Sequence, residues 1–195
     1  FLIAQVTVTN TISSICEKIG ADWSEMYPAL KLDKRIGEYS YLNPGLGISG
    51  GNLERDMSTT IKLAEKNNLD CSLIHSFKKN SLSRKNWVYK ILRDYYGNPD
   101  SNLQIAVLGL SYKENTNSVK NSPALEILKL IPETCLLVYD PIVKWEEKWH
   151  FKAKPLDNMY DVMNKSDALL IMTPWKEFEN IDLVKVKKLM KGNLI

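Results

Sequence analysis

The alternation of short apolar strands with helical segments after residue 99 constrains the fold most. The runs 104–109, 135–139 and 168–172 each have the length and apolar character of a buried strand. Helical patterns lie between and after these runs, and repeated units of this kind are typical of a parallel sheet flanked by helices. We therefore expect a three-layer α/β domain, with helices at 122–131, 157–164 and 181–190 and the start of a further strand at 193–195. In the helix at 122–131, Ser122 is expected at the N-cap and Pro123 at the first helical position.

The first half of the chain is predicted to be helical. Apolar residues recur at helical spacing from Ile3 to Ile19, and Gly20 follows as a stop signal. The segment 97–100, Gly-Asn-Pro-Asp, breaks the chain as a linker should. We expect an all-α domain over 1–97 and an α/β domain over 98–195. The expected helices of the first domain cover 3–19, 23–30, 53–67 and 72–96, with a loop rich in Gly, Pro and Asn at 33–52. Leu82 is expected on the apolar, buried side of the helix at 72–96.

Composition and charge exclude several classes of protein. The 195 residues carry a net charge of only +3, and the lysines are scattered, so we expect no nucleic-acid partner. No apolar run approaches the roughly 20 residues that span a bilayer. The segment 1–10 lacks the basic start of a signal peptide. We therefore expect no membrane partner and no export.

The three cysteines, Cys16, Cys71 and Cys135, indicate a reducing compartment. Their number is odd and none has the spacing of a metal-ligand motif, so we expect no disulfide framework and no metal site. A cytoplasmic location fits this pattern best. Cys16 and Cys135 are expected to be small buried groups. His75 and His150 lie outside every motif described below and are expected to be structural or exposed.

A glycine-rich loop, 44–52, leads into the expected helix at 53–67. Gly45, Gly47 and Gly50 lack a Cβ atom and let backbone N–H groups approach a ligand closely. The N-terminus of the helix adds partial positive charge. The loop is thus a candidate cradle for a polar or anionic ligand, and a plain surface turn is the alternative. Asn52 would also serve as the N-cap of the helix.

Several motifs, in order along the chain, resemble those of the UDP-glucose/GDP-mannose dehydrogenase family. The segment 44–56 resembles the signature P-G-x-G-[FYV]-G-G-[SH]-C, followed by two residues and [KV]-D. Each motif alone is weak, but together they are specific. The other matches are the central helix at 1–10, D-x-R-I-G at 33–37, I-A-V-L-G-L-[AS]-[FY]-K at 105–113, T-x-D-x-R-x-S-P at 116–123, V-Y-D-P at 138–141 and T-P-W at 173–175.

The resemblance implies an all-α central dimerisation domain followed by a Rossmann-like, nucleotide-sugar-binding domain. It implies NAD as the cofactor, a UDP- or GDP-linked hexose as the substrate and a homodimer as the assembly. The family's N-terminal NAD-binding domain is absent from the sequence, and the C-terminal domain ends before the family's last motif. We therefore expect the sequence to be a piece of a longer protein.

Asn52 stands at the position of the family's nucleophilic cysteine. In the family, the thiolate adds to a sugar aldehyde, and loss of hydride gives a thioester that water hydrolyses. An amide is a poor nucleophile, and loss of a covalent nucleophile costs on the order of 10⁶ in rate in a serine protease. Asp56 matches an aspartate that assists water activation. Arg55 replaces a lysine that reaches toward NAD, and Lys120 replaces the arginine of a cofactor-facing motif.

Three further positions are predicted to contact the substrate. Arg35 matches a residue that reaches the substrate across the dimer interface, and a guanidinium suits hydroxyls and phosphates. Lys113 matches a lysine that contacts the sugar nucleotide, with Tyr112 supporting it by packing. A surface salt bridge for Arg35 and a solvated loop for Lys113 are the alternatives. The loop glycines Gly45, Gly47 and Gly50 complete the predicted contacts.

Two functions remain open at this point. The first is membership of an NAD-dependent lineage that oxidises a UDP- or GDP-hexose to the uronic acid, impaired here by Asn52. The second is a non-catalytic module that binds sugar nucleotides or supports assembly. A generic α/β module without a ligand is a weaker third, because separate loop motifs match the same family.

Overall fold

The computed structural model describes residues 1–99 and 102–195 and divides into a helical unit, Phe1–Trp87, and a sheet unit, Val88–Ile195. The predicted linker 97–100 ends on Asp100, which lies outside the described residues. The boundary predicted after residue 97 and the observed division differ by helix α5 (Trp87–Tyr96). The hydroxyl of Tyr96 donates to the carbonyl of Asp167 at 2.6 Å, which ties the end of α5 to the sheet unit.

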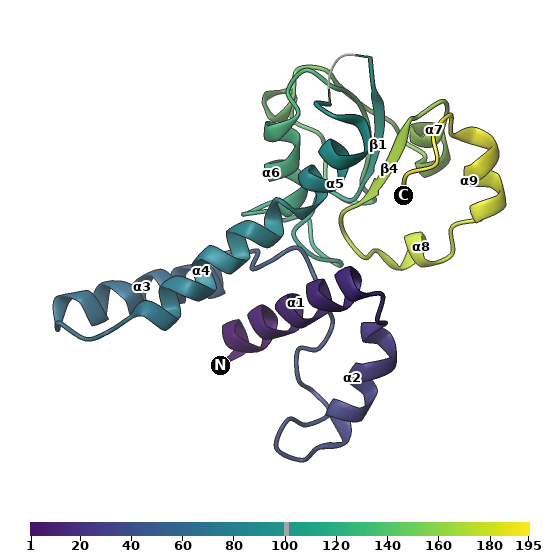
Figure 1. The fold of residues 1–195 in the computed structure, drawn as a ribbon. Helices are drawn as coiled ribbons and strands as arrows, with labels where there is room; N and C mark the ends of the chain where they lie inside the picture. The colour runs from purple at the N-terminus through teal and green to yellow at the C-terminus, as the bar shows by residue number, and fades with distance from the viewer. Residues whose placement is uncertain (100–101) are drawn as a thin grey trace. The chain divides into compact units, whose positions relative to one another are not determined.

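The helical unit contains α1 (Leu2–Ile19), α2 (Trp23–Leu32), α3 (Asn52–Lys66) and α4 (Ser72–Lys85). Helix α1 ends as predicted at Gly20, whose φ of 75° needs a residue without Cβ. Helices α3 and α4 lie side by side as a hairpin (Figure 1). Asn68, with a φ of 54°, reverses the chain between them.

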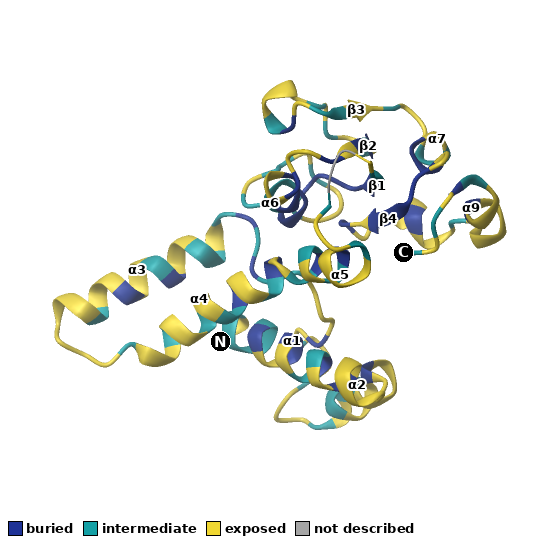
Figure 2. Ribbon diagram, turned by 45° about the horizontal axis from the view of Figure 1, so that its top comes forward, coloured by how far each residue is buried: buried dark blue, intermediate teal, exposed yellow. Residues whose placement is uncertain are grey.

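Helix α1 buries mainly polar residues, while its apolar residues divide between partly buried ones packed against apolar clusters (Ile3, Val6 and Ile12) and exposed ones; Figure 2 shows the burial along the helix. Val8, Ile15 and Ile19 are 52%, 53% and 71% exposed, and their spacing places them on one face of the helix. The opposite side is held by hydrogen bonds, such as the one from Thr9 Oγ1 to the carbonyl of Tyr41 at 2.7 Å. The buried residues of α1 are Thr7, Thr9, Asn10, Ser13 and Cys16.

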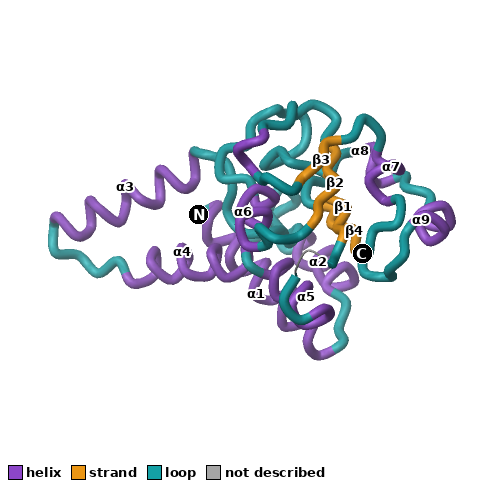
Figure 3. The backbone as a smooth tube through the Cα atoms, turned by 90° about the horizontal axis from the view of Figure 1, so that it is seen from above, coloured by secondary structure: helices purple, strands orange, loops and turns teal. Residues whose placement is uncertain are grey.

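The sheet unit is built on a parallel sheet of four strands in the order β3-β2-β1-β4 (Figure 3). Leu108 at the end of β1 pairs with Tyr139 of β2 and Ile171 of β4, so the carboxyl ends of these strands meet at one edge. The strands are β1 (Gln104–Leu108), β2 (Cys135–Tyr139), β3 (Ala153–Pro155) and β4 (Ala168–Ile171).

Helices cover both faces of this sheet, with α6 on one side and α7 and α9 on the other (Figure 3). Ala106 and Leu108 pack into a core with α7 to α9, while Ile105 and Val107 alternate with them and are equally buried. The fold class predicted from the sequence is therefore confirmed. The helices are α6 (Pro123–Leu130), α7 (Met159–Met163), α8 (Lys176–Glu179) and α9 (Leu183–Leu189), with a short 3₁₀ turn at Glu147–Trp149.

The structure differs from the sequence-based expectations in the helix predicted over 72–96. It is interrupted at Asn86, whose N–H still donates to the carbonyl of Leu82 at 3.3 Å. Asn side chains compete with the helical backbone, which explains a break of one residue. Leu82 was expected on the buried side and is exposed, because α4 turns Ser81 and Lys85 inward.

Three smaller differences concern short elements and one cysteine. Cys135 was expected to be buried and is exposed, because it opens β2 at the end of the sheet, whereas Cys16 is buried as predicted. The expected strand at 193–195 appears as a single parallel bridge between Leu194 and Ala168. Strand β3 and helix α8 were not predicted, since three or four residues carry no readable period.

Among the described residues, none of the helices combines the length and the apolar character that crossing a bilayer demands.

Candidate functional site

The loop that follows β1 begins with a close approach between two backbones. Gly109 has a φ of 89° and donates its N–H to the carbonyl of Tyr139 at 2.8 Å. A Cβ atom at Gly109 would lie 2.6 Å from Cβ and 2.8 Å from the backbone nitrogen of Thr173. Only glycine satisfies both the conformation and the space, so the loops after β1 and β4 meet without a gap.

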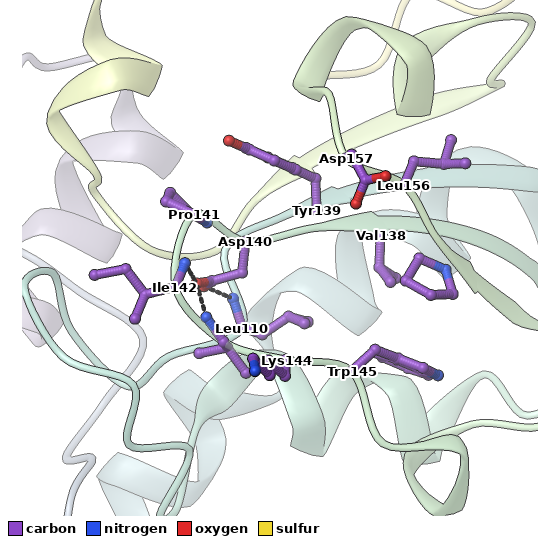
Figure 4. A pocket seen from close by; sticks show the side chains of 12 residues that line it. Leu110, Val138, Tyr139, Asp140, Pro141, Ile142, Lys144, Trp145, Leu156 and Asp157 are labelled. Atoms are coloured by element: carbon purple, nitrogen blue, oxygen red, sulfur yellow. Dashed lines mark hydrogen bonds between the residues drawn. The ribbon is translucent and has the colours of Figure 1, made fainter.

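Asp140, at the carboxyl end of β2, ties three loops together (Figure 4). Its Oδ2 accepts the backbone N–H groups of Leu110 at 2.7 Å and Ser111 at 3.2 Å. The same oxygen accepts the indole N–H of Trp175, after β4, at 3.2 Å. Its Oδ1 accepts the N–H groups of Ile142 at 2.9 Å and Val143 at 2.8 Å. One carboxylate therefore satisfies donors from the ends of three strands.

Three hydroxyl groups donate hydrogen bonds to backbone carbonyls of the loop after β1. Thr173 Oγ1 donates to the carbonyl of Ser111 at 2.7 Å, and Ser111 Oγ donates to the carbonyl of Lys113 at 2.8 Å. Ser122 occupies the N-cap position of α6 with Pro123 at the first helical position, as predicted. Its hydroxyl, however, makes no cap bond and donates to the carbonyl of Leu110 at 2.7 Å. The N-cap residue thus rigidifies the loop after β1.

Beyond this rigid base the loop presents Tyr112 and Lys113. The N–H of Tyr112 donates to the carbonyl of Ser118 at 3.0 Å, which folds the segment back on itself. The ammonium of the exposed Lys113 lies 5.7 Å from the centroid of the Tyr112 ring, within the range of a cation–π contact. Lys120, predicted to face the cofactor, is exposed on a turn whose N–H contacts Ser118 Oγ at 3.5 Å.

A cavity of about 470 Å³ opens at the carboxyl ends of β2 and β3, beside Asp140 (Figure 4). Ligands of open α/β sheets bind at this end of the strands. Burial, with further effects from the carboxylates of Glu177 and Asp140, raises the pKa of Tyr139 to about 12. Tyr139 therefore keeps its proton at neutral pH, and a hydrogen bond with the carboxylate of Glu177 engages its hydroxyl. Lys144 and Trp145 supply a cation and an aromatic face to the same cavity.

Sequence analysis did not single out the residues that organise this edge. Tyr139 and Asp140 belong to the V-Y-D-P block, and Thr173 and Trp175 belong to the T-P-W block. Both blocks were noted only as matches. The sequence feature that could have identified these residues is an acid or a hydroxyl directly after a predicted strand, because parallel strands bring their following loops together at one edge of the sheet.

The glycine-rich loop of the helical unit is packed against α1 and α4. Gly45 donates its N–H to Asn10 Oδ1 at 2.7 Å and accepts at its carbonyl from Arg84 Nε at 2.9 Å. Gly47 has a φ of 84°, and a Cβ atom there would lie 2.6 Å from the carbonyl oxygen of Ser81. Ser81 Oγ accepts the N–H of Ile48 at 2.8 Å. These contacts explain Gly47 by packing, whereas a Cβ atom at Gly45 would meet no neighbour within 4 Å, and contact of Gly45, Gly47 and Gly50 with a substrate stays a prediction.

The predicted N-cap at Asn52 is wrong. Gly51 occupies the N-cap position, and Asn52 is the first residue of α3 and is exposed. The backbone of Asn52 is already helical, so its side chain is not placed to cap the N–H groups that follow it. Glu54, which stands at a common proline position of the family, binds the buried ammonium of Lys85 at 2.6 Å.

The predicted charged site residues of the helical unit are paired with their own neighbours. Arg55 and Asp56 follow Asn52 on the first turns of α3, and the guanidinium binds Asp56 Oδ1 at 3.0 Å. Arg35 Nη2 lies 2.5 Å from Asp33 Oδ2, and this guanidinium holds the pKa of Asp33 below its usual range. Both ion pairs are exposed, so each contributes little to stability. Asn52 and Asp56 do lie on one helix, as the motif spacing predicted.

Comparison with known proteins identifies the same family in both units. Residues 106–195 match the UDP-glucose/GDP-mannose dehydrogenase family, UDP binding domain. Residues 1–81 match the central domain of the same family.

The chain is also similar to characterised relatives over its whole length. It is 34% identical over 200 residues to UDP-glucose 6-dehydrogenase of Bacillus subtilis and covers 43% of that protein. It is 30% identical over 200 residues to UDP-glucose 6-dehydrogenase of Rickettsia bellii and covers 46% of it. The chain therefore spans less than half the length of these relatives.

Solved structures agree on the fold. A UDP-glucose dehydrogenase from Pyrobaculum islandicum matches with a TM-score of 0.86 at 22% identity, over all of this chain and 48% of that one. A UDP-D-ManNAc dehydrogenase from Pyrococcus horikoshii matches with a TM-score of 0.77 at 22% identity, over 98% of this chain and 43% of that one. The ordered motifs, the parallel sheet and these matches agree, and the chain belongs to the UDP-glucose/GDP-mannose dehydrogenase family.

Proposed function

We propose that this chain binds a UDP-linked hexose through the loop 109–113 of its sheet unit. The observation that carries the proposal is the rigid loop itself, which presents Lys113 from a segment matching the family's UDP-binding domain. A fixed backbone lowers the entropy lost on binding, and an exposed ammonium attracts a diphosphate. Lys144 and Trp145 give the adjoining cavity a cation and an aromatic face for the rest of the ligand.

The uridine base is the preferred base in this proposal. Family members act on UDP- or GDP-linked sugars. The domain that matches residues 106–195 is a UDP binding domain, and the two bacterial relatives are UDP-glucose 6-dehydrogenases. UDP-glucose is accordingly the first ligand to test.

Covalent oxidation through residue 52 is not part of the proposed function. Asn52 has no ionisable nucleophile, and the thioester route of the family needs one. Arg55 and Asp56, which would support that chemistry, bind each other. This pairing favours the second candidate, a module that binds the sugar nucleotide without oxidising it twice.

The described residues do not fit a dinucleotide site. In dinucleotide-binding folds, a G-x-G-x-x-G turn leads directly into a helix whose N-terminus faces the pyrophosphate. Here Gly109 is followed by an extended loop, and α6 begins only at Pro123. We derive no step through NAD, and contacts of Arg55 and Lys120 with that cofactor stay predictions.

A homodimer through the helical unit is the proposed assembly. The face of α1 formed by Val8, Ile15 and Ile19 is apolar and exposed, while the polar face is turned inward. A soluble helix normally does the reverse. A second copy of the same face would remove these side chains from water, as an isologous interface does.

Calorimetry with UDP-glucose and GDP-mannose tests the binding proposal. Heat of binding is expected with UDP-glucose, and the affinity should fall by about tenfold or more in Lys113→Gln, because hydrogen bonds to charged groups contribute about 1.5–3 kcal/mol. Lys129→Gln, an exposed lysine of α6 paired with Glu126, is the matched control and should bind normally. Absence of binding by the unsubstituted protein would overturn the proposal.

An NADH absorbance assay with NAD and UDP-glucose, run on a longer protein that also carries the family's NAD-binding domain, separates the two candidate functions, because the described residues alone offer no dinucleotide site. Binding of UDP-glucose without NADH formation supports the non-catalytic module. Binding with sustained formation of two NADH per UDP-glucose would show that residue 52 does not need a thiol.

Restoring the thiol examines the environment of residue 52 by itself. In Asn52→Cys, the first turn of α3 and the nearby Arg55 should lower the pKa of the new thiol. Iodoacetamide should then label residue 52 about tenfold faster than the exposed Cys135 at neutral pH, as counted by peptide mass spectrometry. Labelling slower than that of Cys135 would mean that the surroundings of residue 52 do not activate a thiol at this position.

A further inference from the structure

Three side chains with metal-ligating atoms meet at the turn of the α3–α4 hairpin. One ligand atom each from Glu65, Cys71 and His75 lies within 4.8 Å of the other two. Glu65 belongs to the last turns of α3, Cys71 is the N-cap of α4 and His75 follows in its first turns. The glycine-rich loop and the loop 109–113 use none of these residues.

The backbone of the hairpin fixes where these three side chains start. Asn68 reverses the chain with a φ of 54°, and the N–H of Leu69 returns to the carbonyl of Ala64 at 2.9 Å. The N–H of His75 bonds the carbonyl of Cys71 at 3.1 Å, so these two residues share one helical turn. Cys71 also packs against the apolar cluster of Ile48, Met57 and Ile61. The three ligands are therefore brought together by the fold and not by chance rotamers on separate surfaces.

The geometry is close to that of a tetrahedral site. His75 Nε2 lies 3.4 Å from Glu65 Oε1. Two ligands about 2.0–2.1 Å from a tetrahedral zinc ion are roughly 3.4 Å apart. Cys71 and His75 have the i, i+4 spacing that places two ligands on one helical face, as in zinc-binding helices. The three ligand atoms lie within 4.8 Å of one another, so the side chains would move closer together to bind one ion.

An ion pair between His75 and Glu65 explains only part of this arrangement. It needs a protonated imidazole and does not involve the half-buried thiol of Cys71. Thiolate, neutral imidazole and carboxylate together form a ligand set suited to Zn²⁺, with the fourth position open to water. The thiolate also selects against Mg²⁺ and Ca²⁺, which prefer oxygen ligands.

We propose that Glu65, Cys71 and His75 form a Zn²⁺ site that clips the end of the α3–α4 hairpin. The site is separate from residue 52, because Glu65 lies thirteen positions along α3 from Asn52, or roughly 20 Å at 1.5 Å per residue. The expectation of no metal site, drawn from the sequence, considered cysteine motifs alone. Glu65 joins the other two ligands only through the turn of the hairpin.

Titration of the purified chain with Co²⁺, a spectroscopic substitute for Zn²⁺, tests the proposal. One equivalent of Co²⁺ per chain should give a thiolate-to-metal charge-transfer band together with the visible bands of a four-coordinate ion. Added Zn²⁺ should abolish both sets of bands. Absence of a thiolate band with excess Co²⁺ would overturn the proposal.

Single substitutions assign the ligands. Cys71→Ser should abolish the thiolate band, and His75→Ala and Glu65→Gln should each weaken Zn²⁺ binding by at least about tenfold, the lower range for loss of even an outer-shell partner. Cys135→Ser, at an exposed cysteine of the sheet unit, is the matched control and should bind normally. Circular dichroism checks that each variant folds. If Cys71→Ser abolishes the thiolate band but His75→Ala and Glu65→Gln bind Zn²⁺ as tightly as the unsubstituted chain, the thiol binds the metal without the other two residues. The proposed three-residue site is then wrong.

Discussion

In the sheet unit, strands bury apolar side chains on both faces, whereas in the helical unit the buried positions of α1 are mostly threonine, asparagine and serine, and three apolar residues, Val8, Ile15 and Ile19, are exposed (Figure 2). The difference shows where each unit obtains its stability. The sheet unit removes its own apolar surface from water, and its polar loops are organised by Asp140. In the helical unit, polar side chains of α1 form hydrogen bonds with the backbone of the loop 41–48. The apolar face of α1 stays exposed, and a second copy would cover it in the proposed dimer.

Two glycines with the same backbone conformation, one in each unit, give the sharpest comparison. Gly109 and Gly37 both have a φ of 89°, but only Gly109 is crowded by Thr173. Gly37→Ala should cost only the backbone strain, about 1–2 kcal/mol. Gly109→Ala adds an overpacking cost, so the total should be about 3 kcal/mol or more. Urea unfolding measures both variants, and equal losses would mean that the contact with Thr173 does not constrain the loop.

The exposed face of α1 provides the next largest effect. Ile15→Glu would place a charge in the proposed interface, where an unpaired buried charge costs several kcal/mol. Dimer affinity should fall by at least about 100-fold, which corresponds to roughly 2.7 kcal/mol. Sedimentation velocity over a concentration series measures the change. Leu73→Glu, at an exposed leucine of α4, is the control, and equal behaviour of the two variants would remove α1 from the interface.

Asp140→Asn tests the organisation of the sheet unit. The amide keeps the shape of the side chain, but its NH₂ group faces N–H donors that now lack an acceptor. The loss should be about 2 kcal/mol, within the range for hydrogen bonds to charged groups. A fall of roughly 4–8 °C in the thermal midpoint would follow for a chain of this size. An unchanged midpoint would mean that the loops after β1, β2 and β4 hold together without this carboxylate.

Asp167, at the start of β4, gives a smaller effect that depends on pH. Burial acts to raise its pKa, but the N–H of Gln104 at 2.9 Å and the ammonium of Lys191 at 2.8 Å outweigh burial, and the pKa lies below its usual range. A depressed folded-state pKa stabilises the protein above the unfolded pKa of about 3.9, and the contribution is lost as pH falls toward the folded pKa. Asp167→Asn should therefore cost about 1 kcal/mol at neutral pH.

Urea midpoints at neutral and acid pH measure this dependence. The difference between Asp167→Asn and the unsubstituted protein should shrink once pH falls below about 3.9. A difference that stays constant over that range would show that the charge of Asp167 does not stabilise the fold.

Local patterns predicted most of the fold, because they depend on neighbours in the sequence. Gly20 ends α1 and Pro123 opens α6 where the expected signals stood. The parallel sheet followed from the alternation of elements. Strand β3 escaped prediction because Ala153–Pro155 is too short to show a period.

The sites were less predictable, because they depend on side chains that the fold brings together. The conformation of Gly109 could be read from the motif, but not its contact with Thr173, sixty-four positions later. Ser122 was expected to cap α6, yet its hydroxyl serves the loop after β1. Asn52 was expected to cap α3, yet Gly51 takes that position. In the first two cases a long-range contact decided the outcome, whereas the backbone of Gly51, with a φ of −114° that any residue adopts, does not explain why it takes the N-cap position from Asn52.

Hydrogen–deuterium exchange with and without UDP tests most directly whether the loop after β1 is the nucleotide-binding element. We predict slower exchange in the segments 109–113 and 142–145 when UDP is bound, with little change in the hairpin segment 66–72. Protection confined to other parts of the chain, with these two segments unchanged at saturating UDP, would contradict the account.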